Sequence, residues 1–319
     1  MNKGPVISVV VPVFNEEPVI MESYRRLTAV MAGLGEPYEI IFVNDGSWDA
    51  SAEIIGGLTE RDAGVALINF SRNFGHQSAI TAGMDYARGR AVVVIDADLQ
   101  DPPEVIPAMI NAWRAGSDVV YGKRISRQGE TFFKRFSAAV FYRLLKKMTG
   151  FDIPVDAGDF RLIDRKVCNA MKSLGEKNRY IRGLISWVGF KQSAVEYARD
   201  KRFAGETKYP LKKMMQLAMD GIAAFSYKPL RFATTLGFII SLLSFAYIVV
   251  VIYQRLFTDT TITGWSSLIG VVLLTQGIVL MTLGLIGEYI GRIFDETKNR
   301  PVYIVSEIIG GGARDSHME

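Results

Sequence analysis

Cysteine and histidine are nearly absent from this chain of 319 residues, which contains one cysteine and two histidines. The single cysteine, Cys168, excludes an intramolecular disulfide and a cysteine-based metal site, and it fits a reducing compartment. No Gly-x-Gly-x-x-Gly follows the first strand pattern and no Walker-type lysine loop occurs. These absences argue against dinucleotide enzymes and P-loop nucleotide hydrolases. The start of the chain also lacks the pattern of a signal peptide.

Charged residues are missing from two long windows, residues 232–253 and 265–287. A helix of either length can cross a hydrocarbon core about 30 Å thick. A buried core helix is the alternative for either window, but two such windows in succession favour a pair of transmembrane helices. We therefore expect a two-helix membrane domain over residues 229–291.

Basic residues flank this pair of windows on the outside, whereas residues 257–264 between the windows carry none, and only Arg255 lies near them, just after the first window. The flanking residues are Lys228, Arg231, Arg292, Lys298 and Arg300. Because Lys and Arg stay on the cytoplasmic side of a span, both ends of the pair should face the cytoplasm. The expected protein is a multi-pass protein of the inner membrane, with a cytoplasmic domain at 1–228 and a cytoplasmic tail at 292–319.

Before the first window, short β-branched runs alternate with amphipathic helical patterns. This alternation is typical of a doubly wound, mostly parallel α/β sheet. The expected strands are 6–13, 38–43, 65–69, 91–96 and 118–121. The expected helices are 17–31, 50–59, 77–87 and 104–115. The first half of the chain is thus predicted to form one α/β domain of a size that suits a nucleotide.

Two carboxylates one residue apart, Asp96 and Asp98, follow the apolar run at residues 92–95. The carboxyl ends of strands are the ligand-binding side of an open α/β sheet. Two hard oxygen donors at this spacing suit Mg²⁺ or Mn²⁺ bridging a diphosphate. Taken alone, the pair could equally be a solvated turn, because acidic residues are common in turns.

Three other predicted strands also end in polar segments, at residues 12–17, 44–47 and 71–75. Asp45 could accept hydrogen bonds from a base or ribose, Gly46 allows close backbone approach, and Arg72 could meet a phosphate. Each segment alone is an ordinary turn. Four polar strand ends that meet at the same side of one sheet favour a ligand site.

Five segments in this order resemble the polyisoprenyl-phosphate glycosyltransferases of the GT-A fold, glycosyltransferase family 2. They are VVPVFNE at 10–16, VNDGS at 43–47, SRNFG at 71–75, DADLQDP at 96–102 and GDFRL at 158–162. The pattern is most similar to bacterial bactoprenol glucosyltransferases and extends over about residues 6–305, with both apolar windows included.

The resemblance implies a GT-A, Rossmann-like domain and a metal-dependent hexosyltransferase. Such an enzyme moves glucose from UDP-glucose to undecaprenyl phosphate at the cytoplasmic membrane face and makes a lipid-linked sugar for the cell envelope. The same chemistry with a mannose or aminoarabinose donor stays open, as does a non-catalytic nucleotide-binding scaffold. A processive synthase is disfavoured, because the chain has no Arg-Trp pair and only two expected spans.

The resemblance also implies roles for individual residues. The nucleotide-sugar site would comprise Pro12, Phe14, Asn15, Glu16, Asp45, Arg72, Asp96 and Ala97. The Mg²⁺ or Mn²⁺ ligands would be Asp96, Asp98 and Gln100. The acceptor phosphate would meet Arg124, Arg135, Arg202 and Lys208. Asp159 would be catalytic together with Asp98, first as a positioning group, although a base role stays open. Its alternative is an aspartate in a loop that pairs with Arg161.

Two further segments, about 131–148 and 211–227, combine apolar and basic residues in helical patterns. They are expected to lie as interfacial helices on anionic lipid, although the first could instead pack its aromatic side chains into the core. The net charge of +4 gathers near the membrane segments, so lipid and sugar nucleotide explain it better than nucleic acid does. Glycines at sevenfold spacing in the second window allow close packing, either between the spans or in a homo-oligomer.

Overall fold

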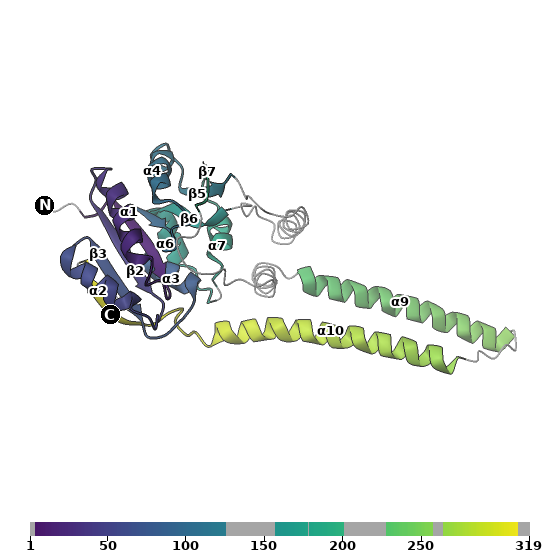
Figure 1. The fold of residues 1–319 in the computed structure, drawn as a ribbon. Coiled ribbons are helices and arrows are strands. Elements are labelled where there is room, and N and C mark those ends of the chain that lie inside the picture. Colours follow the sequence, from purple (N-terminus) through teal and green to yellow (C-terminus); the bar gives the residue numbers. More distant parts are fainter. Residues whose placement is uncertain (1–3, 126–156, 178, 201–227, 258–263, 312–319) are drawn as a thin grey trace. The chain divides into compact units, whose positions relative to one another are not determined.

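The computed structural model describes residues 4–125, 157–177, 179–200, 228–257 and 264–311. The chain divides into two compact units, Met1–Met214 with Pro301–Glu319, and Met215–Arg300. The first unit is an α/β domain and the second contains two long helices (Figure 1).

An eight-stranded sheet organises the α/β unit, in the order β7-β5-β6-β4-β1-β2-β3-β8. Its strands are β1 (Ile7–Val13), β2 (Tyr38–Asn44), β3 (Val65–Phe70), β4 (Ala91–Val94), β5 (Val119–Arg124), β6 (Ala157–Asp164), β7 (Gln192–Tyr197) and β8 (Val305–Gly310). The central pairings β4-β1, β1-β2 and β2-β3 are parallel, as is β5-β7. β6 lies antiparallel between β4 and β5, and β8 lies antiparallel to β3.

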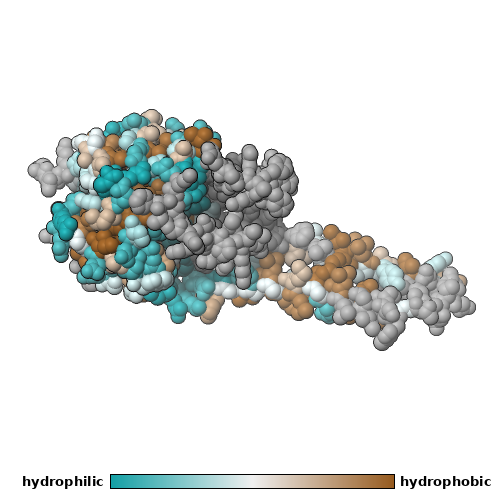
Figure 2. All heavy atoms as spheres, in the orientation of Figure 1, coloured by the Kyte–Doolittle hydropathy of each residue, from teal (hydrophilic) through white to brown (hydrophobic). Residues whose placement is uncertain are grey.

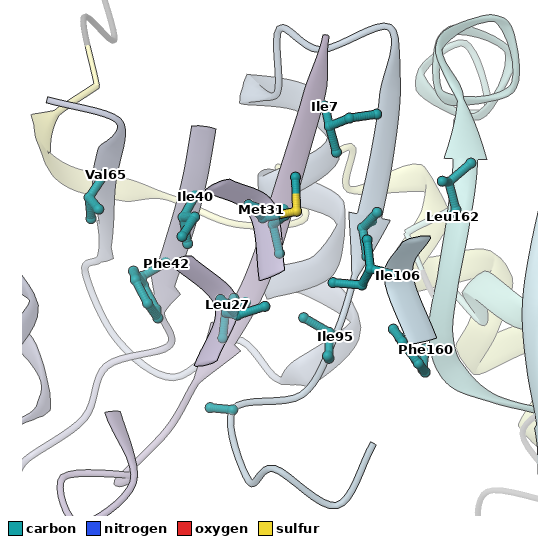
Figure 3. Close-up of a cluster of buried hydrophobic side chains, with 14 of the residues drawn as sticks. Ile7, Leu27, Met31, Ile40, Phe42, Val65, Ile95, Ile106, Phe160 and Leu162 are labelled. Atoms are coloured by element: carbon teal, nitrogen blue, oxygen red, sulfur yellow. The ribbon is translucent and has the colours of Figure 1, made fainter. Parts of the chain in front are cut away.

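The helices of this unit connect successive strands. They are α1 (Ile20–Ala32), α2 (Ser51–Arg61), α3 (His76–Tyr86), the 3₁₀ turn η1 (Pro103–Val105), α4 (Ile106–Arg114), α6 (Arg165–Lys172) and α7 (Ile181–Trp187). Alternate residues of β1 join apolar residues of α1, α2 and α4 in one core. Figure 3 labels Ile7, Leu27, Met31, Phe42 and Ile106 within this cluster.

The opposite face of the sheet packs against α3. Side chains alternate along a strand, so Val10 faces away from the cluster that contains Ile7. A Cβ atom at Gly83 of α3 would lie 2.1 Å from a methyl group of Val10, so only glycine permits this close approach. Helices therefore cover both faces, which confirms the predicted doubly wound, mostly parallel α/β sheet.

All five predicted strands are present, with shifted boundaries. β4 ends at Val94 rather than Asp96, so the two acidic residues lie in the loop that follows the strand. The predicted helix at 104–115 consists of η1 followed by α4. Strands β6, β7 and β8 were not predicted. β8 places part of the expected C-terminal tail inside the sheet.

The second unit contains α9 (Lys228–Phe257) and α10 (Trp265–Thr297), which lie side by side (Figure 1). Hydrophobic residues cover much of its visible surface (Figure 2). Among the described residues, one segment, Leu274–Thr297 in α10, is long and apolar enough to cross a membrane. The apolar segment of α9, Ala233–Tyr247, is shorter, so the second span stays a prediction. The predicted interfacial helices lie outside the described residues.

The segment around β8 is fastened to β3 by side chains as well as by the strand pairing. The ring of Tyr303 stacks on Phe70, with 5.3 Å between centroids and 10° between planes. Its hydroxyl donates a hydrogen bond of 2.9 Å to Asp85 at the end of α3, and Ser71 donates its backbone N–H to Ile304. The contacts with Phe70 and Ser71 lie at the start of the loop that connects β3 to α3, and the contact with Asp85 lies at the far end of α3.

We expect Tyr303→Phe to lower the free energy of unfolding by about 1.5–3 kcal/mol, because it removes a hydrogen bond to a charged acceptor and keeps the stacked ring. The measurement is chemical denaturation of the purified protein in detergent. Tyr247→Phe in α9, where the tyrosine side chain is exposed, is the matched control. Equal stability of Tyr303→Phe and the control would contradict this anchoring role.

Candidate active site

The loops after β1 and β2 are joined by hydrogen bonds. Asn15 donates its backbone N–H to Ser47 Oγ at 3.0 Å and accepts the N–H of Trp48 on its own Oδ1 at 3.0 Å. The N–H of Glu16 reaches Ser51 Oγ at 3.0 Å. Asn15 has a φ of 55°, a left-handed conformation that asparagine tolerates better than most residues. These hydrogen bonds hold the two loops together, so we treat them as one wall of the site at the carboxyl ends of β1 and β2.

Aromatic side chains line this wall. The rings of Phe14 and Trp48 meet edge to face, with centroids 5.0 Å apart, and Trp48 is 81% exposed. Pro12 lies within β1, opposite Val43 of β2, so it fixes where the loop leaves the sheet. An exposed aromatic surface of this kind can pack against a planar ring such as a base.

Asp45, after β2, shapes the loop that follows β3. Its carboxylate accepts the backbone N–H groups of Phe74 at 2.7 Å and Gly75 at 3.0 Å. Burial raises the pKa of Asp45, although these two N–H groups and nearby positive charge oppose the rise. Gly46 has a φ of 68°, and a Cβ there would lie 2.6 Å from the backbone of Arg72. The guanidinium of Arg72 lies 4.2 Å from the ring centre of Phe74.

The acidic pair lies in the loop after β4. Ala97 and Leu99 are buried, and Leu99 has a φ of 58°, so the loop turns sharply between its acidic residues. Asp98 is 7% exposed and accepts the backbone N–H of Gln100 at 3.1 Å. Asp96 Oδ1 is buried and accepts no hydrogen bond from the described residues. A buried carboxylate oxygen that accepts no hydrogen bond is stabilised by a nearby cation.

Asp159 is held by two cationic side chains. Arg182 of α7 binds it through both carboxylate oxygens, with Nε–Oδ1 at 2.8 Å and Nη2–Oδ2 at 2.9 Å. His76 Nε2, at the start of α3, lies 3.4 Å from Asp159 Oδ2 and 3.5 Å from Asp96 Oδ1. His76 thus connects the loop after β4 with the opposing strand β6.

This geometry corrects the alternative considered for Asp159 from the sequence. Asp159 lies in strand β6 rather than in a loop, and its bidentate partner is Arg182 rather than Arg161. Arg161 is buried, and its Nη2 donates to the carbonyl of Gly158 at 2.8 Å. Burial lowers the pKa of Arg161 to about 10.

The cluster has strongly shifted pKa values. Burial alone would raise the pKa of Asp159, but Arg182 and His76 hold it well below its usual value. Burial would lower the pKa of His76, but Asp159 and Asp96 raise it to about 9. Burial raises the pKa of Asp96 to about 6, with His76 opposing the rise and the other aspartates adding to it. At neutral pH the geometry therefore favours an ionised Asp159 beside a charged histidine.

His76 and Arg182 were not among the predicted site residues. His76 directly follows the SRNFG segment, and this position beside a motif was the one feature of the sequence that could have pointed to it. Nothing in the sequence pointed to Arg182, because α7 lies outside all five motif segments along the chain. Its position depends on contacts of α7 with α6 and on a hydrogen bond of 3.0 Å from the N–H of Ile181 to Gln77 Oε1 of α3.

Arg124, at the end of β5, is the one predicted acceptor-phosphate residue that the structure describes. Its Nη2 lies 3.6 Å from Asp101, and its Nε donates to the hydroxyl of Tyr197 at 3.3 Å. The other three predicted acceptor-phosphate residues lie outside the described residues. They are Arg135, Arg202 and Lys208.

The described residues contain no cluster of three or more His, Cys, Asp or Glu side chains suited to a metal ion. Mg²⁺ is commonly bound by one or two carboxylates together with substrate phosphates. Asp96, whose Oδ1 accepts no hydrogen bond from the described residues and lies 3.5 Å from His76 Nε2, and the neighbouring Asp98 fit that kind of shared site.

Polar loops and carboxylates thus gather at the carboxyl ends of β1 to β4 in a mostly parallel sheet. This arrangement is typical of α/β enzymes that bind a nucleotide at that side of the sheet.

The chain belongs to glycosyl transferase family 2, whose profile matches residues 8–171, and residues 228–293 match the GtrB C-terminal hairpin. It is therefore a glycosyltransferase. The first matched region covers the α/β domain from β1 to α6, and the second covers α9 and most of α10.

Similar proteins cover nearly the whole chain. It is 62% identical over 322 residues to the uncharacterized glycosyltransferase YkcC of Bacillus subtilis (strain 168), covering 100% of both chains. It is 42% identical over 302 residues to the prophage bactoprenol glucosyl transferase homolog of Escherichia coli (strain K12), covering 95% of this chain and 99% of the relative. These matches confirm the resemblance that the five segments predicted.

A solved structure with the same fold is glucosyl-3-phosphoglycerate synthase from Mycobacterium tuberculosis, in complex with Mn²⁺, UDP-glucose and phosphoglyceric acid. The TM-score is 0.50 at 21% sequence identity, over 70% of this chain and 79% of that one. The likeness supports the predicted GT-A fold.

Proposed function

We propose that this chain transfers glucose from UDP-glucose to a polyisoprenyl phosphate such as undecaprenyl phosphate. The observation that carries the proposal is near-full-length similarity to proteins named bactoprenol glucosyl transferase, at 43% identity over 94% of this chain for that of Shigella phage SfII. The acidic loop after β4 and the cationic groups around it supply a site for a diphosphate and a second phosphate.

The donor would lie across the carboxyl ends of β1 to β4. The loop from Pro12 to Glu16 and Asp45 would hold the uridine, with Phe14 offering an aromatic surface to the base. Arg72 and the loop that contains Ala97 would approach the diphosphate. Because Asp45 also accepts two backbone N–H groups, it would position the β3 loop as well as the nucleotide.

Asp96, Asp98 and Gln100 would hold a divalent cation, Mg²⁺ or Mn²⁺, on the donor diphosphate. Such a cation neutralises the charge that develops on the leaving diphosphate. The two carboxylates supply only part of a coordination shell, so phosphate oxygens of the donor would complete it. The site would therefore bind its cation and donor together.

The reaction would invert the anomeric carbon. An oxygen of the acceptor phosphate forms the new bond to that carbon, while the bond to UDP breaks and its electron pair leaves with the diphosphate. A phosphate monoester has a second pKa of about 6, so the nucleophile is largely deprotonated at neutral pH. Asp159, whose pKa lies well below its usual value, would be a weak base. We therefore assign it a positioning role shared with His76 and Arg182.

The chain organisation that would accompany this function is a cytoplasmic catalytic domain at 1–228, a two-helix membrane domain at 229–291 and a cytoplasmic C-terminal segment from 292, whose strand β8 belongs to the sheet of the catalytic domain. The apolar segment Leu274–Thr297 supports at least one membrane contact. The absence of basic residues at 257–264 supports the predicted orientation in the inner membrane. An acceptor with a long hydrocarbon chain would then reach the enzyme within the bilayer.

Purified protein in detergent, given radiolabelled UDP-glucose and undecaprenyl phosphate, is expected to form a lipid-extractable labelled product. EDTA should reduce the product to background, and excess Mn²⁺ or Mg²⁺ should restore it, because the two carboxylates need the cation to hold the diphosphate. The measurement is label in the organic phase over time, with heat-denatured enzyme as a control.

Labelled lipid from GDP-mannose or a UDP-aminoarabinose donor, but not from UDP-glucose, would support a polyisoprenyl-phosphate glycosyltransferase and show that glucose is the wrong donor sugar. Activity unaffected by EDTA would overturn the cation site. Absence of label with every donor would overturn the proposed function.

A further inference from the structure

Asp101 is a buried carboxylate shared by two arginines. It is fully buried, and its Oδ1 lies 3.6 Å from Arg124 Nη2 and 3.5 Å from Arg199 Nε. The hydroxyl of Tyr197 donates a short hydrogen bond to the same oxygen. The other oxygen, Oδ2, accepts no hydrogen bond from the described residues. Arg124 comes from β5, whereas Tyr197 and Arg199 come from the end of β7 and the residues that follow it.

The charges of this group do not balance. A buried carboxylate requires a cationic partner, and one arginine would suffice to neutralise it. Within this group, two guanidinium groups around one carboxylate leave one surplus positive charge, and at 3.5–3.6 Å from Asp101 Oδ1 both arginines keep N–H donors for another acceptor. Guanidinium groups bind phosphate through paired N–H donors, so a surplus of this kind favours a phosphate ligand.

Packing fixes the position of the tyrosine that completes the group. The ring of Tyr197 meets Phe160 edge to face at 5.7 Å, and a Cβ on Gly122 would lie 2.7 Å from it. Burial, together with Asp101, raises the pKa of Tyr197, so its hydroxyl stays protonated and donates. Asp101 therefore has a defined position from which to orient both arginines.

The group lies directly beside the proposed cation loop. Asp101 is the next residue after Gln100, whose backbone carbonyl accepts the N–H of Asp200 at 2.9 Å. This bond ties the segment containing Arg199 to the loop of Asp96 and Asp98. Of the two arginines, Arg199 is the more exposed, at 31% against 18% for Arg124.

We infer that Asp101 is a positioning residue that holds Arg124 and Arg199 together as a two-arginine phosphate clamp. Arg199 is then a second phosphate-binding residue, additional to those implied by the family resemblance. The inference rests on the proposed function, which supplies two phosphate-bearing substrates, the lipid phosphate and the nucleotide diphosphate. The clamp binds a phosphate group of one of them.

The test is steady-state kinetics of Arg199→Gln, with the concentrations of undecaprenyl phosphate and UDP-glucose varied separately. Loss of one charge-assisted contact should raise one KM by about tenfold to a hundredfold, with a smaller change in kcat. A rise for the lipid phosphate identifies the acceptor as the ligand, and a rise for UDP-glucose identifies the donor. Arg199→Lys keeps the positive charge but lacks the planar guanidinium group with its paired N–H donors. Its KM should therefore rise less than that of Arg199→Gln.

Asp101→Asn tests the positioning role and should raise the same KM as Arg199→Gln. If that variant fails to fold, Gly158→Ala provides an independent test. Its new Cβ would lie 2.8 Å from Arg124 Nη2, so it displaces the movable end of one arginine without removing a charge. It too should raise that KM.

Arg25→Gln, which removes an arginine that is 68% exposed on α1, is the matched control and should leave both KM values unchanged. An active wild-type enzyme whose KM values change less than twofold in Arg199→Gln would overturn the clamp. Failure of the wild-type enzyme to glycosylate any lipid phosphate would instead overturn the proposed function, so the two failures are distinguishable.

Discussion

Asp98→Ala is expected to lower the rate of sugar transfer by about two to three orders of magnitude, comparable with removal of one strong electrostatic stabiliser from an active site. The carboxylate is nearly buried in the loop after β4, two residues from Asp96, whose Oδ1 accepts no hydrogen bond from the described residues. In the proposed reaction it helps to hold the cation on the leaving diphosphate. The measurement is kcat for labelled lipid formation at saturating Mn²⁺.

Two further variants separate this effect from a change of structure. Asp98→Asn retains an oxygen that can accept the N–H of Gln100, so the loop should keep its conformation while the charge is lost. Glu60→Ala removes an exposed carboxylate of α2 and should keep wild-type activity. If Asp98→Asn and Asp98→Ala both retained more than a fifth of the wild-type rate, the assignment of Asp98 to the cation site would be wrong.

Arg182→Ala should destabilise the α/β unit by about 3 kcal/mol, because it leaves the carboxylate of Asp159 buried without its bidentate partner. His76 remains beside Asp159, which places the effect at the lower end of the range for broken buried pairs. The midpoint of thermal unfolding should fall by roughly 6 to 12 °C in a domain of this size. Differential scanning fluorimetry in detergent measures it.

The double variant Arg182→Ala with Asp159→Asn should recover much of the lost stability, because the unpaired charge is gone. Arg25→Ala, at an exposed site on α1, should change the midpoint little. If the double variant were as unstable as Arg182→Ala alone, the loss would come from packing of α7 rather than from the ion pair.

The central sheet could be predicted because its strands are buried on both faces. β1 to β4 are rich in β-branched and other apolar residues with few polar ones, and every residue of β1 and β4 is buried, so these runs stand out from the surrounding helices. β7 and β8 mix half-buried and exposed positions without a regular alternation and carry polar residues, so their sequences resemble those of many surface segments. Their place in the sheet depends on pairing with strands that are distant in the sequence.

The same distinction applies to the site. Asp45, Asp96 and Asp98 directly follow predictable strands, so their meeting at one side of the sheet follows from the strand pattern. The partners that set their charge states come from elsewhere. Arg182 reaches Asp159 from α7, and Arg199 reaches Asp101 from the segment after β7. Such contacts between distant segments leave no periodic pattern or motif in the sequence.

The pairing of β8 with β3 makes the α/β unit discontinuous in the chain, and this affects how a soluble fragment should be designed. A fragment that stops before the membrane helices would lack β8 and would expose the backbone N–H and C=O groups of β3. Unpaired edges of this kind recruit other chains and promote aggregation. A better fragment would join residue 200 to residue 301 with a glycine-serine linker long enough to cross the sheet, because β7 and β8 are its two edge strands. It would thereby keep both Tyr303 and the strand that covers β3.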